Sequence, residues 1–510
     1  MSKFNTVKVP DNITTNLAGG KAYKQSTKLA LASLLITSFL CDKAYETEAN
    51  IIKRLEKYYK ELDDKKFFAK AAIYARDKFR LRSISHLAAA IVGEGVATGN
   101  YSEEDKKWLK NFFSKIVMRG DDTTEIISAY KARPNAYKNK AGRVQLTNVM
   151  KKGFSEAIGR MDAYQLAKYR SDKKETSLVD VVRMCHAKPT TRNGVGLAKL
   201  IKGTLKNTET WEAKQTAAGQ VGADSATAEE RTEQVKAAKK EAWAEFVAKG
   251  DKIEYMALLR NLRNILLEAD MDTVNKAVEL VQEPELVKKG KQLPFRYLTA
   301  LMAIAPLGHR GAIEALSKAL EISVDNVPEL PGDTAILVDV SGSMACACQT
   351  CGGVRVDHVA GIFAGALFKK NKGAQIVLFG SHGRFYHANP LDSIASISKG
   401  CEARSEGTYM AAGFGTLKKS YDRIIVLSDM QTWMERGYGM ETREEFKKYA
   451  KKYNPNVKLY SFDLAGNGTM QFPEENVFCI AGLSEHAFDV MSKMEEDKAY
   501  MIHEIEAIEL

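Results

Sequence analysis

The sequence lacks any long hydrophobic run, and this absence limits how the chain could associate with a membrane. Its longest apolar stretch, Leu29 to Leu40 (LALASLLITSFL), is shorter than the ~20 residues that a helix needs to cross a bilayer. The residues before it are polar and do not have the pattern of a cleavable export signal. We therefore expect a cytoplasmic protein without membrane spans.

Cysteine and proline are also scarce. The seven cysteines show no even-spaced framework, which excludes a disulfide scaffold and indicates a reducing compartment. Only 11 prolines, with 45% hydrophobic and 27% charged residues, exclude a long disordered tract. Because single cores stop growing near ~250 to 300 residues, a chain of 510 residues should contain two or three domains.

Strand-like alternation is nearly absent from about Thr27 to Ser323. Stretches such as ANIIKRLEKYYKELDDKKFFAKAAIYARDKF, at residues 49–79, carry apolar residues at spacings of three and four, as one face of a helix does. Short polar or glycine-containing turns separate these stretches. Many helices of ordinary length joined by short loops predict pairs of helices stacked side by side.

The pattern changes after a segment with two prolines and a glycine, Val324 to Asp333 (VDNVPELPGD), which is typical of a linker. Continuous apolar runs such as TAILVDV, AQIVLFG and RIIVLSD then alternate with helical stretches. This alternation predicts a parallel sheet covered on both faces, a doubly wound α/β domain. We therefore divide the chain into a helical domain, 1–330, and an α/β domain, 331–510.

Charge is distributed unevenly between these two segments. From Pro331 onward there are 19 Lys and Arg against 23 Asp and Glu, whereas the preceding residues hold 56 basic against 41 acidic side chains. A positive field of this kind attracts phosphate backbones or anionic lipid. Lysine-rich helix faces that are simply solvated would give the same count.

Three oxygen-bearing side chains follow the first apolar run of the α/β segment. Asp339, Ser341 and Ser343 lie on alternate residues (DVSGS), and Thr408 and Asp429 lie at the ends of later elements. Doubly wound sheets bind ligands at the carboxyl ends of their strands. Carboxylate and hydroxyl oxygens suit a hard cation, Mg²⁺ above all.

This pattern resembles the metal-ion-dependent adhesion site (MIDAS) of von Willebrand factor A (vWA) domains. The resemblance implies that Asp339, Ser341, Ser343, Thr408 and Asp429 hold a divalent cation, whose shell an acidic side chain of a partner completes. One residue departs from the pattern. Such domains often follow the threonine with Asp or Asn, whereas Tyr409 stands here.

A cluster of thiols comes directly after the oxygen-bearing residues. Cys346, Cys348 and Cys351 lie within six residues (CACQTC), and tetrahedral Zn²⁺ would need a fourth ligand. The candidates for that ligand are His358, Asp357 and Cys401. A reduced Cys-rich insertion without metal, or redox chemistry, remains as an alternative to zinc, and the other cysteines (Cys41, Cys185 and Cys479) have the apolar neighbours of core residues.

Common enzyme motifs are absent. The segment VSGSM lacks the G-x-S-x-G pattern of serine hydrolases, and no G-x-G-x-x-G follows the first strand, as a dinucleotide site requires. Gly19, Gly20 and Lys21 do not form a P-loop, because Thr15 occupies the position of its leading glycine. We therefore expect a protein that is not an enzyme.

The helical segment concentrates basic and aromatic side chains within residues 162–192 (DAYQLAKYRSDKKETSLVDVVRMCHAKPTTR). Lysine and arginine contact phosphates, and aromatic rings stack on single-stranded bases without much demand on sequence. The candidate RNA-binding residues are Lys168, Arg170, Lys174, Arg183, His186 and Lys188, with Tyr164 and Tyr169 as stacking partners. Two further basic clusters are Arg76, Lys78, Arg80 and Arg82, and Arg133, Lys138, Lys140 and Arg143.

The helical segment as a whole resembles the TROVE module of the Ro ribonucleoprotein family. The matching stretches are TTNLAGGKAY, FFAKAAIYARDKFRLRSISH, QLAKYR, VVRMCHAKP, MALLRNLRNI and LPFRYLTAL, and the vWA-like segment follows them as in that family. The resemblance implies a ring of HEAT-like repeats whose basic hole takes the single-stranded 3′ end of misfolded noncoding RNA, while Y RNA or a Y-like RNA binds the outer surface.

By position, Lys168 and His186 match the RNA-contacting Lys and His of that family. The family also implies roles in RNA quality control or as a scaffold for an exoribonuclease, and we expect a monomeric ribonucleoprotein. Two alternatives stay open: His186 as a buried core histidine, and Arg260 and Arg263 as structural residues. A different function, a metal-dependent protein-interaction adaptor acting through the vWA-like domain, is the main alternative.

Overall fold

The computed structural model describes most of the chain. The described residues are 13–15, 21–24, 26–37, 48–170, 174–207, 210–221, 227–290, 292, 294–323, 329–346, 355–432, 441–464, 469–470, 477–481, 493 and 499–510. Among these residues, no helix is both long and apolar enough to pass through a bilayer.

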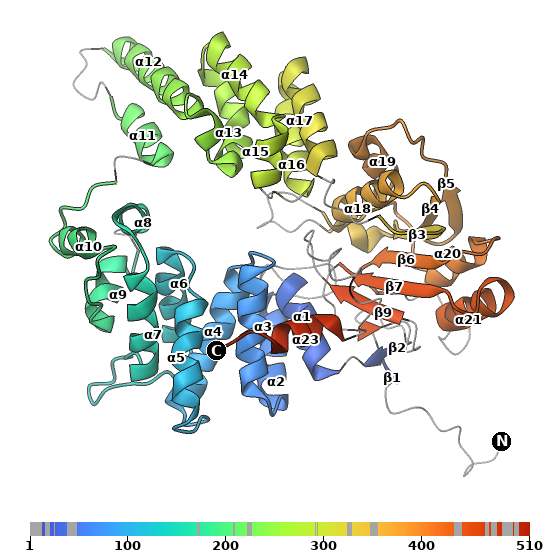
Figure 1. Cartoon of the computed structure of the whole chain (residues 1–510), viewed down its shortest axis with the longest axis horizontal. Helices are drawn as coiled ribbons and strands as arrows, with labels where there is room; N and C mark the ends of the chain where they lie inside the picture. Colours follow the sequence, from blue (N-terminus) through green and yellow to red (C-terminus); the bar gives the residue numbers. More distant parts are fainter. Residues whose placement is uncertain are drawn as a thin grey trace. The chain divides into compact units, whose positions relative to one another are not determined.

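The chain divides into two compact units (Figure 1). The sheet unit consists of Met1–Ile84 and Val324–Ile508, and the helical unit consists of Ser85–Ser323 with Glu509–Leu510. The first 84 residues thus group by their contacts with the C-terminal part of the chain, although the sequence division assigns them to the helical domain.

The reason for this grouping lies inside the sheet unit. The C-terminal helix α23 (Tyr500–Glu506) packs against α3 (Lys65–Asp77). Tyr74 Oη donates a hydrogen bond of 2.7 Å to Glu504, and Lys28 forms an ion pair with Glu506. Contacts between residues more than 400 positions apart therefore hold α1 (Thr27–Thr37) and α3 in this unit, and α2 (Glu48–Glu61) packs on α1.

The helical unit is a succession of helices joined by short connections. Its α-helices are α4 (Ser83–Ala97), α5 (Asp105–Lys115), α6 (Gly120–Lys131), α7 (Asn148–Gly159), α8 (Ala163–Lys168), α9 (Leu178–Cys185), α10 (Gly194–Ile201), α11 (Trp211–Ala218), α12 (Ala228–Val247), α13 (Tyr255–Glu268), α14 (Met271–Val281), α15 (Pro284–Gly290), α16 (Pro294–Ile304) and α17 (Arg310–Ser323). The short 3-10 helices η1 (Gly250–Lys252) and η2 (Ala305–Leu307) lie between them.

Helices that are close in sequence pack on one another, as the periodicity predicts. The pairs are α5 with α7, α11 with α12, α13 with α14, and α16 with α17, and Figure 1 shows them lying side by side. Between α5 and α7 the approach is close, because a Cβ atom at Gly153 would lie 2.5 Å from Phe113 Cβ. Phe112, Phe113 and Phe154 are fully buried at this contact.

The sheet unit is built on a six-stranded sheet in the order β5-β4-β3-β6-β7-β9. All neighbours are parallel except the edge strand β5, which runs antiparallel to β4. The strands are β3 (Thr334–Asp339), β4 (Ala374–Phe379), β5 (Gly383–Tyr386), β6 (Arg423–Ser428), β7 (Lys458–Asp463) and β9 (Val477–Ala481). The central strands β3 and β6 are buried at every residue, as continuous apolar runs predict.

Helices cover both faces of this sheet (Figure 1). On one face, α20 (Met410–Thr416) and α21 (Glu441–Tyr453) pack Phe414 and Phe446 against Leu337 and Val426. The helix α18 (Val356–Lys370), which packs with α19 (Ile394–Gly400), contacts β3, β4 and β6. The predicted fold class, helical repeats followed by a doubly wound parallel-sheet domain, is confirmed. Closure of the helices into a ring stays a prediction.

A second, small sheet in the sheet unit was not expected from the sequence. It pairs β1 (Ile13–Thr15) with β2 (Lys21–Lys24), and β2 with β8 (Thr469–Met470), all antiparallel. These strands are very short, and β8 lies far along the chain from β2, so no local pattern marks the pairing.

Candidate functional site

The candidate RNA-binding residues lie on two consecutive short helices of the helical unit, α8 and α9, and on the residues that follow each of them. The side chain of Asp162 caps α8 by accepting from Gln165 N at 2.8 Å, and Ser177 caps α9 in the same way through Asp180 N. Such capping boxes satisfy backbone donors that a helix start leaves open. The two helix starts are therefore fixed by local sequence.

The amphipathic pattern of α9 decides which residues are available. Leu178, Val181, Val182 and Cys185 are buried, which confirms the core position expected for Cys185. The opposite side leaves three candidates exposed to solvent: Arg183, His186 and Lys188.

His186 is the residue that ends α9, with φ 51° and ψ 47° in the left-handed region. A residue other than glycine is uncommon there. The backbone turn points the chain away from the helix directly after Cys185. Because the His186 side chain is exposed, the alternative of a buried core histidine is wrong.

Lys168, at the end of α8, is held by two carboxylates. Its Nζ lies 3.5 Å from Glu254 Oε2 and 3.7 Å from Glu212 Oε1, and the side chain is only 18% exposed. Burial lowers the pKa of Lys168, but the charges of Glu254 and Glu212 outweigh it and raise the pKa above its ordinary value. A phosphate at Lys168 would have to replace these partners.

Two other candidates bond within the protein. Arg170 donates to the carbonyl oxygen of Leu205, and Lys174 forms an ion pair with Glu125 of α6. The structure thus separates the six candidates into a group with partners inside the protein (Lys168, Arg170 and Lys174, of which Lys174 is exposed) and an exposed group (Arg183, His186 and Lys188).

The two tyrosines differ in their surroundings. Tyr164 is 40% exposed, and its hydroxyl donates to Glu254 Oε1 at 3.1 Å. Tyr169 is half-buried, with the Arg119 guanidinium 4.7 Å from its ring centre. Of the two rings, Tyr164 is the more available for stacking on a base.

The two further basic clusters predicted from the sequence differ in how exposed their residues are. Arg76 is buried in α3, whereas Lys78 and Arg80 are exposed, and all three belong to the sheet unit. In the other cluster, Arg133 pairs with Glu94 at 2.7 Å. The remaining members, Lys138, Lys140 and Arg143, are exposed on the loop before α7.

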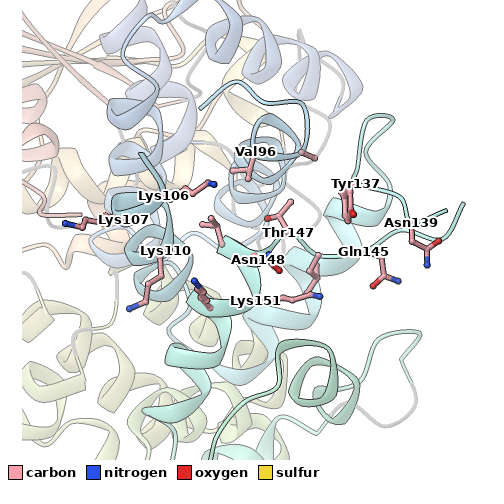
Figure 2. A pocket seen from close by; sticks show the side chains of 14 residues that line it. Val96, Lys106, Lys107, Lys110, Tyr137, Asn139, Gln145, Thr147, Asn148 and Lys151 are labelled. Carbon is pink, nitrogen blue, oxygen red and sulfur yellow. The ribbon is translucent and has the colours of Figure 1, made fainter. Parts of the chain in front are cut away.

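Sequence reasoning missed a group of lysines on α5 and α7. Lys106, Lys107, Lys110, Lys151 and Lys152 line one hollow of the helical unit together with Tyr137 (Figure 2). The paired lysines are visible in the sequence, in the stretches DKKWLK and MKKGF. Each stretch alone is typical of a solvated helix face, and only the packing of α5 on α7 brings the two together.

The candidate metal centre lies in the sheet unit at the carboxyl ends of β3 and β6. These strands are parallel neighbours, with Val338 opposite Leu427, so Asp339 and Asp429 emerge at the same edge of the sheet. Asp339, Ser341, Thr408 and Asp429 are all buried, with 3% exposure or less. Ser341 Oγ lies 3.2 Å from Ser343 Oγ.

Hydrogen bonds from nearby groups fix the two carboxylates. Asp339 accepts from Ser341 N at 2.9 Å and from Ser428 Oγ at 2.6 Å, and Asp429 accepts from Gln431 N at 3.1 Å. Burial, and then the charge of Asp339, raise the pKa of Asp429 to about 7, and burial raises the pKa of Asp339. Two buried carboxylates that oppose each other's ionisation, with hydroxyls beside them, form a donor set that fits a divalent cation.

Tyr409, the departure from the vWA pattern, takes a structural position. Its backbone N–H donates to the carbonyl oxygen of Gly380 at 2.9 Å. The backbone of the preceding residue, Thr408, is also fixed, because its carbonyl oxygen accepts from Thr432 Oγ1 at 3.1 Å.

The thiol cluster is described only in part. Cys346 is half-buried and not in a disulfide, whereas Cys348 and Cys351 lie outside the described residues. Among the proposed fourth ligands, Asp357 forms an ion pair with Arg355, and burial raises the pKa of Cys401 to about 12. His358 is buried, and its Nδ1 has no hydrogen-bond partner within the described part of the chain. Zinc binding by this cluster stays a prediction.

Fold and sites together define a class of protein with two parts, an array of paired helices with basic surfaces and a doubly wound sheet with an oxygen-lined site. The model of the TROVE domain family matches residues 23–237 and 223–326. The chain therefore belongs to the TROVE domain family, as its resemblance to the Ro ribonucleoprotein family predicts. Members of this family bind RNA, and RNA binding is the general function of the chain.

A solved structure supports the fold. The crystal structure of the Deinococcus radiodurans RO (RSR) protein is similar with a TM-score of 0.59, covering 93% of this chain and 100% of that chain at 17% sequence identity. A search of the curated proteins found no match.

Proposed function

We propose that the helical unit binds the single-stranded 3′ ends of misfolded noncoding RNAs, and Y RNA or a Y-like RNA, through the basic residues of α8, α9 and the segment after α9. The observation that carries the proposal is the exposed group Arg183, His186 and Lys188, which lies on α9, at its C-terminal cap and in the segment directly after it. Basic side chains contact phosphates without needing a particular base sequence.

The ion-paired Lys168 adds a second component to this binding. Its partners Glu254 and Glu212 are about half exposed, so solvent screens the two ion pairs, and such pairs contribute little, ~0 to 1 kcal/mol. An RNA phosphate competes for the same ammonium. Lys168 therefore changes partner when RNA binds, and Tyr164 beside it offers a ring for base stacking.

The test is the affinity of the full chain for an RNA hairpin with a free 3′ tail, measured by fluorescence anisotropy. The double variant His186→Ala, Lys188→Ala should lose affinity on the order of a hundred-fold or more, because each of two hydrogen bonds to a charged phosphate contributes ~1.5 to 3 kcal/mol and ~1.4 kcal/mol is ten-fold. The matched control is Lys276→Ala, an exposed lysine paired with Glu279. Unchanged affinity in the double variant, with an intact melting curve, contradicts the proposal.

Within the cell, the chain would act in RNA quality control or hold RNA for an exoribonuclease. It would work in the cytoplasm as a monomeric ribonucleoprotein that catalyses no reaction itself. The family membership and the basic surfaces of the helical unit support this role. Sequencing the RNA that copurifies with the protein would identify its RNA partner, and a pool without noncoding RNA would contradict the role.

A second function is favoured by the oxygen-lined site of the sheet unit. Asp339, Ser341, Ser343, Thr408 and Asp429 would hold Mg²⁺, and an acidic side chain of a protein partner would complete its shell, making the chain a metal-dependent adaptor. The support is the pair of buried carboxylates beside the hydroxyls of Ser341 and Ser343, together with the buried Thr408. Asp339→Ala should abolish protein complexes and leave RNA binding intact, and complexes that survive both this change and EDTA would rule the adaptor out.

A further inference from the structure

The missed lysines line a cavity of about 880 Å³ that lies entirely within the helical unit. Its walls are the end of α4, the start of α5, the loop of residues 137–147 and the start of α7 (Figure 2). We call this cavity the lysine groove. Its volume falls in the range of ~300 to 1,000 Å³ that holds organic ligands, so the groove is larger than a single phosphate needs.

The charge of the lysine groove has one sign. Among its 14 lining residues there are five lysines and no Asp or Glu. Lys106 and Lys110 have acidic partners beside the groove, Glu103 and Glu156. In the described part of the chain no ion pair involves the other three lysines: Lys107, Lys151 and Lys152. The groove therefore attracts an anion with several charges.

The start of α7 adds backbone donors to this charge. Thr147 is the residue before the helix, and its side chain makes no capping hydrogen bond. Its Oγ1 is buried without a hydrogen-bond partner within the described residues. Thr147 and Asn148 both line the groove. An uncapped helix start carries free N–H groups and the positive end of the helix dipole, which together favour a phosphate.

A rigid hairpin forms one rim of the groove. Asn139 N donates to Arg143 O at 3.0 Å, Gln145 N donates to Tyr137 O at 2.7 Å, and Asn139 Oδ1 accepts from Arg143 N at 3.0 Å. Tyr137 is held at its backbone N–H by Tyr130 Oη at 2.8 Å, yet it is 50% exposed. The backbone of Tyr137 is therefore fixed, and its ring is exposed at the edge of a basic cavity, where it can stack on an unpaired base.

From these features we infer that the lysine groove binds a short single-stranded segment of RNA, separately from the surface at α8 and α9. Lysines 107, 151 and 152 and the start of α7 contact the backbone phosphates. Tyr137 stacks on one base, and the side-chain amides of Gln145 and Asn148 face base edges. The aromatic ring and the amides favour a nucleic acid over an acidic peptide, which would use the lysines alone.

The test uses the full chain and a labelled oligouridylate as the probe. The triple variant Lys107→Gln, Lys151→Gln, Lys152→Gln should weaken binding on the order of ten-fold. The slope of the logarithm of the binding constant against the logarithm of salt concentration should also become smaller in magnitude by about 2. The reason is that each phosphate contact on a single strand contributes ~0.7 to this slope. Tyr137→Phe should bind like the unaltered protein and Tyr137→Ala several-fold more weakly, since stacking needs a ring. Melting curves confirm that each variant folds.

The arms of the experiment separate this inference from the proposed function. If the double variant His186→Ala, Lys188→Ala loses binding and the triple variant does not, the lysine groove is not an RNA-binding site. The proposed function is unaffected by that result. If only the triple variant loses binding, the result supports RNA binding by the lysine groove and contradicts RNA binding by the surface at α8 and α9. Equal binding of a blunt RNA duplex overturns the single-strand assignment, and full competition by polyglutamate favours an acidic protein partner instead.

Discussion

At the scale of single residues, the main finding is that the two residues matched to RNA contacts by position have different environments. His186 is exposed at the end of α9, whereas Lys168 is held between Glu254 and Glu212. The sequence could not show this difference, because Glu254 lies 86 positions from Lys168 and nothing local links them. A carboxylate that holds a binding lysine also competes with the ligand.

Glu254→Gln should therefore strengthen RNA binding. The change removes one competing charge from Lys168, and an exposed ion pair is worth ~0.2 to 1 kcal/mol, so affinity should rise by up to about five-fold. The measurement is a titration of the tailed RNA hairpin at low salt, with Glu279→Gln as the control for loss of one negative charge. An unchanged or lower affinity would show that Lys168 does not contact the RNA.

The carboxylates of the candidate metal centre allow a second prediction at this scale. At ~100 times its dissociation constant, a bound cation stabilises a protein by ~2.7 kcal/mol, so Mg²⁺ should raise the melting temperature of the sheet unit by several degrees. Asp429→Asn should remove this response. In EDTA the variant should be at least as stable as the unaltered protein, because the repulsion between Asp339 and Asp429 is gone.

Calorimetry of the full chain in EDTA and in Mg²⁺ measures both effects. Glu444→Gln, a change at an exposed residue of α21, is the control. If Mg²⁺ stabilises Asp429→Asn as much as it stabilises the control, then Asp429 is not a ligand.

At the scale of elements, the sequence predicted what depends on local pattern. The strands β3, β4 and β6 follow from the continuous apolar runs of the sequence. The sequence did not predict the small sheet, because β1, β2 and β8 are very short and the third strand, β8, lies far along the chain from β2. The lysine groove was missed for the same reason, since it forms only where α5 meets α7.

The α5–α7 contact makes a prediction about stability. Gly153→Ala would place a Cβ atom 2.5 Å from Phe113 Cβ and 2.8 Å from Lys110 O, and overpacking of this kind costs ~1 to 3 kcal/mol. Gly194→Ala is the matched control in the same unit, because its new Cβ would have Pro189 Cβ as its nearest neighbour at 3.7 Å. Urea unfolding measures both. A Gly153→Ala variant as stable as the control would mean that α5 and α7 do not approach this closely.

At the scale of the whole molecule, the two units differ in the chemistry they offer. The helical unit offers lysines, a histidine and exposed tyrosines, which suit RNA. The sheet unit places buried carboxylates and hydroxyls at the ends of its strands, which suit a cation. RNA binding and the proposed metal-dependent protein binding would therefore be separable, and a variant that loses one should keep the other.

The most direct test of the account is to map where RNA touches the protein. The full chain, bound to a hairpin RNA with a free 3′ tail, would be crosslinked by ultraviolet light, and the crosslinked peptides identified by mass spectrometry. The account predicts crosslinks within residues 162–192 and at Tyr137 in the lysine groove. Crosslinks confined to the sheet unit, or none in the helical unit, would contradict it.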